Sequence, residues 1–160
     1  EGGSINFGDY SVGLGAISRS EDVLLKIVNG NISLGSNSIY NYIKNISLNG
    51  SKAILSDNSG GIFDLNKDGQ IGIYTYDGDV YSNRTIYVRE GTGAVGLYAK
   101  TGLTNDMYVS GLKINVESGQ TGVIIDANPL YSVDIFLNNE IYVIGNHGIG
   151  MVYEEGKIFN

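Results

Sequence analysis

The chain contains no cysteine and no tryptophan, and only one proline (Pro129), one histidine (His147) and three arginines. The lack of cysteine excludes a disulfide framework and a thiol nucleophile. With a lone histidine and no cysteine beside it, a zinc site is not expected. The net charge of −7, with ten scattered Lys and Arg residues, argues against nucleic acid or anionic lipid as a partner. No apolar run approaches the length of a membrane span, so the chain is not expected to cross a membrane itself.

What the chain has instead is glycine, 24 in 160 residues, together with many Ile, Val, Tyr and Asn residues. This composition favours short strands separated by tight turns over helices. A chain of this length that is 42% hydrophobic is long enough for one domain with a sizeable core. It opens with EGGSINFG, without a start methionine or signal peptide. This start predicts that residues 1–160 are either a mature piece or a single segment excised from a longer protein.

One short phrase returns along the chain, a glycine followed immediately by an aliphatic residue. Its copies are YSVGLGAI (10–17), GQIGIYTY (69–76), GAVGLYAK (93–100), GQTGVIID (119–126) and HGIGMVYE (147–154). A second phrase, of the form I-x-V, I-x-L or I-x-F, precedes most of them, at residues 5–7, 32–34, 46–48, 86–88, 114–116 and 141–143. A corner rich in Gly, Asn and Ser separates the two phrases.

These phrases predict a solenoid. Each unit is a strand, a corner, a strand and a corner over roughly 20–30 residues, which is the period expected of solenoid repeats. The alternation within each strand has a period of two. One such coil cannot bury its own apolar face, so successive coils must stack about 4.8 Å apart and pair their backbones. We therefore predict an all-β fold, a parallel β-helix of about six coils.

The register of the glycine phrase predicts which side chains face inward. The aliphatic residues on either side of each glycine should stack as an inner ladder: Val12/Leu14, Ile71/Ile73, Val95/Leu97, Thr121/Val123 and Ile149/Met151. The glycines themselves should then lie on the outer side, together with Gly15, Tyr74, Tyr98, Ile124 and Val152. The last four of these residues would form an apolar stripe on the outer wall.

Some segments match the template less well. Residues 51–57 (SKAILSD) form a degenerate copy with Ala53 in the glycine position, while residues 39–46 and the insertion around 58–67 fit poorly. Residues 20–30 (SEDVLLKIVNG) are the one serious helix candidate, because a serine N-cap and two acids begin the segment. Since that segment also aligns with the alternating run DMYVSGLKINV, we favour a strand there.

The phrases SVGLGAI, IGIYTY and AVGLYAK, with their I-x-V strands and Gly/Asn corners, resemble the passenger repeats of large type V autotransporter adhesins. The texture is most similar to that of fusobacterial outer-membrane adhesins, and the resemblance covers nearly the whole chain. It implies a right-handed parallel β-helix, export across two membranes and display outside the cell on the bacterial outer membrane. It also implies that this chain is a fragment of a longer passenger.

The stretch DLNKDG has the spacing of a calcium-binding loop, with Asp64, Asn66 and Asp68 in the first, third and fifth positions. Thr75 stands at the twelfth position, where a glutamate would close the cage. The alternative is a solvated corner, because Asn, Asp and Gly tolerate the positive φ that a turn needs. We favour the corner, with a weak calcium site through these three residues as the second interpretation. No other cofactor is expected.

The stripe of Tyr74, Tyr98, Ile124 and Val152 is the better candidate for a ligand-binding surface. Tyrosine offers a flat face and a hydroxyl, as sugar stacking and protein interfaces require. The simpler interpretation is that the tyrosines fill outer positions that their β-propensity favours, or that a loop covers them. Both interpretations place these residues on the outer wall.

An enzyme is the main alternative, because β-helices also carry polysaccharide lyases and hydrolases. These need converging carboxylates, or calcium with a basic side chain. Asp77 and Asp79 could converge with Asp57, or with Arg89 and Glu90, but no spacing singles them out. The single histidine lies in a corner, and no serine has a G-x-S-x-G context. We therefore expect a non-catalytic module that binds a host or bacterial cell-surface protein or glycan, with a purely structural stalk as the other alternative.

Overall fold

The computed structural model describes residues 4–28, 31–102, 106–117, 119–128, 134–144, 147–153 and 157–159, and every regular element in these ranges is a strand. The strands are β1 (Ser4–Asn6), β2 (Val12–Ser18), β3 (Val23–Ile27), β4 (Asn31–Ser33), β5 (Ile39–Asn45), β6 (Ala53–Asp57), β7 (Ile62–Leu65), β8 (Ile71–Tyr76), β9 (Asp79–Ser82), β10 (Thr85–Val88), β11 (Val95–Lys100), β12 (Met107–Val116), β13 (Thr121–Asp126), β14 (Asp134–Val143), β15 (Ile149–Tyr153) and β16 (Lys157–Phe159). β3 occupies the helix candidate, which confirms the strand interpretation. The described residues contain no helix that is long and apolar enough to span a membrane.

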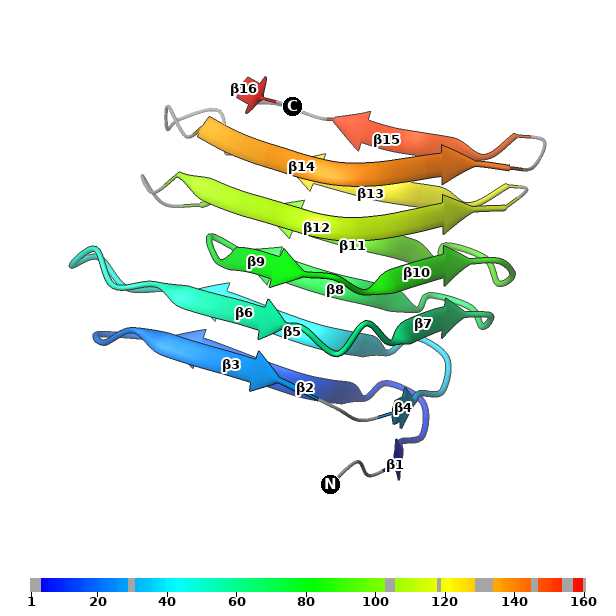
Figure 1. Cartoon of the computed structure of the whole chain (residues 1–160), viewed down its shortest axis with the longest axis horizontal. Coiled ribbons are helices and arrows are strands. Elements are labelled where there is room, and N and C mark those ends of the chain that lie inside the picture. Colours follow the sequence, from blue (N-terminus) through cyan, green and yellow to red (C-terminus); the bar gives the residue numbers. More distant parts are fainter. Residues whose placement is uncertain are drawn as a thin grey trace.

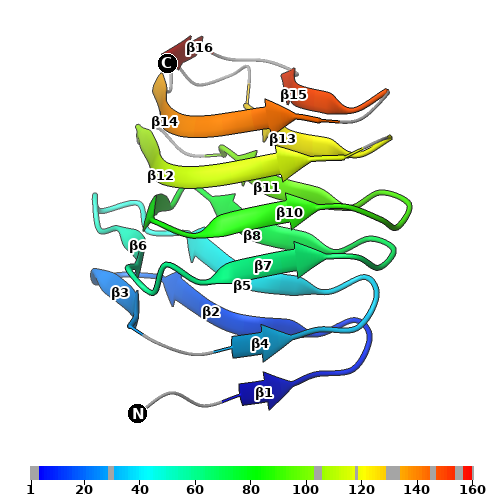
Figure 2. The same ribbon diagram turned by 45° about the vertical axis from the view of Figure 1, so that its right-hand side comes forward.

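The strands form a coil in which each pairing is parallel. The rear sheet consists of β2, β5, β8, β11, β13 and β15, and the front sheet of β3, β6, β9, β12, β14 and β16 with β7 and β10 beside them. A small pair, β1 and β4, continues below β7 and β10 (Figure 2). In Figure 1 the front strands run to the right, the rear strands run to the left and the chain rises toward its C-terminus. The coil is therefore right-handed.

Each coil returns to the rear sheet after 24 to 32 residues. Along the column Val12, Ile39, Ile71, Val95, Thr121 and Ile149, successive partners are 27, 32, 24, 26 and 28 residues apart. The stack amounts to about five turns of a β-solenoid, and the six predicted coils correspond to the six strands of the rear sheet. The all-β parallel β-helix is therefore confirmed.

Columns of side chains from successive coils fill the interior. On the inner side of the rear sheet one column contains Leu14, Asn41, Ile73, Leu97, Val123 and Met151. Ile73, Leu97 and Val123 are buried, and Leu14 packs against the same core. This half of the predicted inner ladder is confirmed, with one polar residue, Asn41, inserted in it.

The glycines of the repeat face the interior, so the prediction that they lie on the outer wall is wrong. A Cβ added to Gly72 would lie 3.1 Å from Ile86 Cδ1, and a Cβ on Gly122 would lie 2.8 Å from Val116 Cγ2. Ile86 and Val116 belong to the second phrase of the repeat, so the two phrases meet across a narrow interior. Glycine is required there because the walls approach too closely for a side chain.

The other half of the predicted inner ladder, the residues that precede the glycines, lies on the outer side. A Cβ added to Gly15, which faces outward, would lie 3.8 Å from Val12 Cγ1. Val12 and Ile149 are 46% and 47% exposed, and Val95 is buried without belonging to the core cluster. Each glycine and the residue after it both point inward, as at a β-bulge. A strict period of two could not foresee that local shift.

Three further sequence assignments are corrected by the register. β5 is a regular strand of the rear sheet in which Tyr40 takes the glycine position and packs its ring 4.4 Å from that of Phe63. β7, inside the supposed insertion, replaces residues 46–48 as the second phrase of its coil. Ala53 belongs to β6 in the front sheet, not to the glycine column. The 32-residue coil concealed this register because it departs most from the average spacing.

Gly96→Ala should lower the free energy of unfolding by about 1–3 kcal/mol, the usual effect of overpacking. The new Cβ would lie 2.7 Å from Gly122 O and 2.9 Å from Ile114 Cγ2, both of which are fixed parts of the walls. Gly15→Ala is the matched control, because its Cβ would meet nothing closer than 3.4 Å. Urea unfolding of both variants measures the difference, and equal midpoints would contradict the close approach.

Candidate functional site

Three tyrosines stack on the outer side of the rear sheet. The ring centroids of Tyr42 and Tyr74 are 5.2 Å apart, and those of Tyr74 and Tyr98 are 5.4 Å apart, with interplanar angles of 6° and 22°. The whole column, from β2 to β15, is Gly15, Tyr42, Tyr74, Tyr98, Ile124 and Val152. The structure thus brings the predicted stripe together in its predicted order. It adds Tyr42, which was missed because residues 39–46 fitted the template poorly.

A second apolar column runs beside this tyrosine ladder. It contains Val12, Ile39, Ile71, Val95, Thr121 and Ile149. Each of these residues stands two residues before the inner-column residue of the same strand. The residues of these two columns are neither in the core cluster nor among the partly buried residues packed against it. The two columns together form an outer apolar face that the core does not use.

Charged side chains border the ladder on its other side. Lys100 forms an ion pair with Asp126, and the Tyr98 hydroxyl lies 3.2 Å from Asp126 Oδ2. The hydrogen bond to Asp126 raises the pKa of Lys100, so this ammonium group stays charged. Burial, followed by the neighbouring Tyr42, raises the pKa of Tyr74. Tyr74 therefore stays neutral at physiological pH, and the border of the ladder carries an ion pair.

The stacking decides what the tyrosines can offer to a partner. Rings that lie nearly parallel and about 5 Å apart cover one another's faces, so they present mainly their edges and hydroxyl groups. A partner must therefore lie along the ladder, against the ring edges and the aliphatic column. This differs from the expectation of open tyrosine faces on which single sugar rings could stack.

Two of the three predicted calcium ligands, Asp64 and Asp68, interact with other groups of the protein. Arg89 Nε lies 3.2 Å from Asp64 Oδ1, and Asp68 Oδ1 accepts a hydrogen bond of 2.7 Å from the Thr92 backbone N–H. Asn66 is exposed. Within the described ranges, no group of three or more His, Cys, Asp or Glu side chains is arranged to hold a metal. The geometry fits the corner interpretation.

A buried glutamine that no motif indicated holds this corner. Gln70 Oε1 accepts hydrogen bonds from the backbone N–H groups of Asn66 and Lys67, at 2.9 and 3.1 Å. Its Nε2 donates to the carbonyl oxygens of Leu34 and Gly35 on the previous coil, at 3.0 and 3.1 Å. The loop amides therefore point toward Gln70, whose side chain ties the turn to the previous coil.

Three of the carboxylates considered for catalysis, Asp57, Asp77 and Asp79, have separate structural partners. Asp79 holds Lys52 Nζ at 2.9 Å and the Tyr108 N–H at 3.0 Å, and Asp77 accepts from the Gly102 N–H. Asp79 of β9 pairs with Ile54 of β6, and Asp57 lies three residues further along β6. At about 3.3 Å per residue the two lie roughly 10 Å apart and on opposite faces. They therefore do not converge on one substrate.

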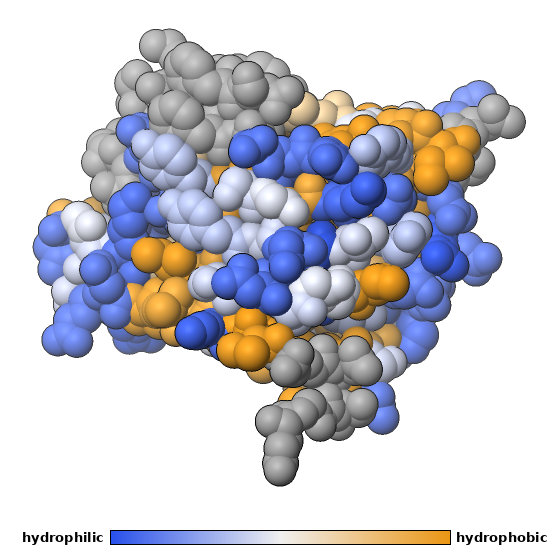
Figure 3. Space-filling model, viewed as in Figure 1, coloured by the Kyte–Doolittle hydropathy of each residue, from blue (hydrophilic) through white to orange (hydrophobic). Residues whose placement is uncertain are grey.

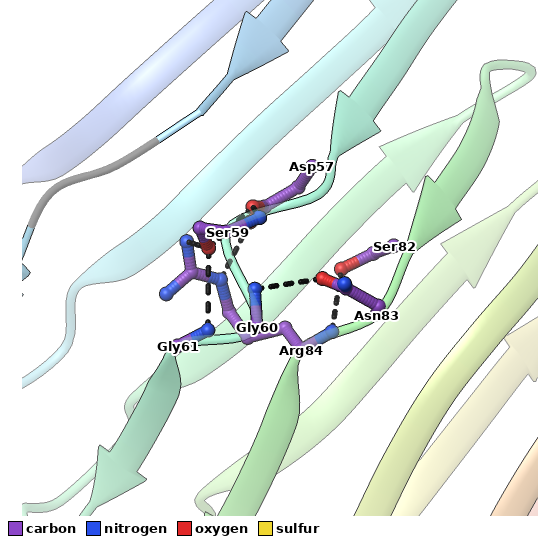
Figure 4. Close-up of polar contacts among 7 residues, drawn as sticks. All are labelled: Asp57, Ser59, Gly60, Gly61, Ser82, Asn83 and Arg84. Atoms are coloured by element: carbon purple, nitrogen blue, oxygen red, sulfur yellow. Dashed lines mark hydrogen bonds and ion pairs between the residues drawn. The ribbon is translucent and has the colours of Figure 1, made fainter.

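The front corner between β6 and β7 contains a buried ion pair (Figure 4). Arg84 Nε lies 2.5 Å from Asp57 Oδ2, and the two side chains are 3% and 0% exposed. Arg84 Nη2 also donates to Ser59 Oγ at 2.6 Å, and its guanidinium carbon lies 4.1 Å from the centroid of the Phe63 ring. Gly61 leaves room for this group, since a Cβ there would lie 2.6 Å from Arg84 Nη1. The ion pair therefore fixes the corner whose Gly60 N–H donates to Asn83 Oδ1.

The fold and these surfaces define the chain as a right-handed parallel β-solenoid with an apolar outer face. No protein-family model, curated protein or solved structure matches the chain.

Proposed function

We propose that this chain is a non-catalytic recognition segment of a bacterial surface passenger, of the type V autotransporter adhesin class that its repeats resemble. The observation that carries the proposal is the outer apolar face with its tyrosine ladder, which the core does not use. Contiguous apolar surface of this kind is typical of a site that binds a partner. The partner would be a host or bacterial cell-surface protein or glycan, met outside the cell at the outer membrane.

The mechanism follows from repetition and stiffness. Parallel coils about 4.8 Å apart hold equivalent side chains at a fixed spacing, and interlocked rings lose little further freedom when a partner binds. The net charge of −7 would repel acidic cell surfaces in general. Specific contacts would therefore come from the neutral ladder and the aliphatic column beside it.

The double variant Tyr74→Ala/Tyr98→Ala should reduce binding of the purified chain to target cells at least tenfold, because aromatic anchors carry much of the energy of an interface. Flow cytometry with a labelled chain on mammalian and bacterial cells measures this. Tyr81→Ala/Tyr108→Ala is the control, since it removes two exposed tyrosines from the front sheet. A stalk would show equal, background binding for all three proteins.

The enzyme alternative makes a different prediction in the same preparation. A lyase or hydrolase would release products from a polysaccharide and would lose that activity in Asp79→Asn. The separation of Asp57 from Asp79 supports the non-catalytic proposal, because glycoside hydrolysis needs two carboxyl groups flanking one bond. Product release would overturn the proposal even if cell binding were also observed.

A further inference from the structure

The corner between the two halves of the front sheet shortens from coil to coil. Between equivalent paired positions the chain takes six steps at residues 56–62, four at 81–85, three at 110–113 and two at 138–140. In Figure 1 the early coils therefore break between β6 and β7 and between β9 and β10, whereas β12 and β14 run straight through. Because the corners of the later coils contain fewer residues, the front sheet has a hollow where a short corner lies above a longer one.

This hollow is a cleft of about 380 Å3, within the ~300–1,000 Å3 range of ligand pockets. Its polar side chains include Asn83, Thr85, Lys113, Asn138 and Glu140. The front face that carries it is a mosaic of hydrophilic side chains with separate hydrophobic patches (Figure 3). An apolar ligand would strand these polar groups, so the lining selects a polar one.

Several polar groups of the cleft make no hydrogen bond within the part of the chain that the structure describes, so a ligand could pair with them. In the part of the chain that the structure describes, neither Asn138 nor Thr85 uses its side chain in a hydrogen bond. Asn83 accepts from the Gly60 N–H with Oδ1 at 2.8 Å, which leaves its amino group as a donor (Figure 4). Asn139, in contrast, is committed to the backbone of β12, through the Leu112 N–H and the Val109 carbonyl.

The charges of the cleft compensate one another. Lys113 Nζ lies 3.4 Å from Glu140 Oε2, and the Tyr142 hydroxyl donates to the same carboxylate at 2.9 Å. The hydrogen bonds from Tyr142 and Lys113 lower the pKa of Glu140, so it stays ionised at physiological pH. Among the described residues that line the cleft, Glu140 is the only carboxylate. These residues therefore provide no pair of carboxyl groups of the glycosidase kind, and their balanced charges favour a neutral ligand.

We propose that this cleft binds a neutral saccharide. Its hydroxyl groups, which both donate and accept, would pair with the Asn138 carboxamide, the Asn83 amino group, the Thr85 hydroxyl and the Lys113–Glu140 pair. Tyr142, 45% exposed, lies beside Lys113 of the cleft, whose Nζ is 5.1 Å from the centroid of the Tyr142 ring. The site is separate from the tyrosine ladder, so either proposal can fail without the other.

The test is titration of the purified chain with lactose, cellobiose, maltose and diacetylchitobiose, followed by NMR. At least one of them should shift the Tyr142 ring resonances, with a Kd of roughly 0.1–10 mM as expected for an open cleft in which water competes. Asn138→Ala should weaken that binding at least tenfold without changing the unfolding midpoint, since the exposed Asn138 side chain makes no hydrogen bond within the described ranges. Asn66→Ala, an exposed asparagine of the distant calcium-like corner, should bind as the wild type does.

Three outcomes would overturn the proposal. The first is that no saccharide shifts these resonances when its concentration is 50-fold above ~1 mM, which is the middle of the expected Kd range. The second is binding that Asn138→Ala leaves unchanged, which would place the sugar elsewhere. The third is binding of glucuronic acid alone, which would show that the cleft selects anions. Loss of cell binding in the ladder variant, with saccharide binding intact, would separate this site from the proposed adhesive face.

Discussion

Asn41→Leu is expected to raise the free energy of unfolding by about 2 kcal/mol, because an unsatisfied buried polar group costs ~1–3 kcal/mol. Asn41 is 0% exposed and stands between Leu14 and Ile73 in the inner column. Within the residues that the structure describes, neither its Oδ1 nor its Nδ2 has a hydrogen-bond partner. Leucine has the same branched shape and would complete the aliphatic column. In a chain of this size the change corresponds to a Tm higher by about 4–8 °C.

The same strand provides a matched control. Asn45 is equally buried, but its Nδ2 donates to the Ser51 carbonyl at 2.8 Å and its Oδ1 accepts from the Ser47 N–H at 3.0 Å. Asn45→Leu should therefore lower the free energy of unfolding by ~1–3 kcal/mol, since two backbone groups lose their partner. Thermal unfolding followed by circular dichroism measures both variants. A stability loss in Asn41→Leu and also in the smaller Asn41→Val would contradict the unsatisfied amide.

Asp57→Ala is expected to lower the free energy of unfolding by about 3–5 kcal/mol, the usual effect of removing one partner of a buried ion pair. The change would leave the Arg84 guanidinium buried without its carboxylate, and Ser59 would lose the acceptor of its backbone and hydroxyl hydrogen bonds. Urea unfolding gives the difference in free energy. The corner that supports Asn83 should open first, which amide hydrogen exchange at Gly60 would report.

The double variant Asp57→Ala/Arg84→Met distinguishes a lost charge partner from a lost shape. Methionine removes the unpaired charge and keeps an apolar side chain against Phe63, so the double variant should be more stable than Asp57→Ala alone. Arg89→Ala is the control for ion pairs in general, because Arg89 is 43% exposed in its pair with Asp64, and such pairs contribute ~0–1 kcal/mol. A double variant less stable than Asp57→Ala would contradict this account of the corner.

Much of the fold was predictable because it depends on local repetition. The glycine phrase and the I-x-V phrase are both short, and each recurs along the chain. Their spacing is enough to predict stacked parallel strands. The order Tyr74, Tyr98, Ile124 and Val152 followed from the same alignment. Tyr42 did not, because its coil is 32 residues long and carries Tyr40 where the others carry glycine.

The sequence by itself determined the solenoid, since a coil with one apolar face has no other way to bury it. Only the tertiary structure decided which side of each strand is inside, because the bulge at each glycine depends on how closely the opposite wall approaches. It also decided the surfaces. Whether tyrosines stack, and whether a corner shortens enough to leave a cleft, depends on the register between coils, to which residues up to 32 positions apart contribute together.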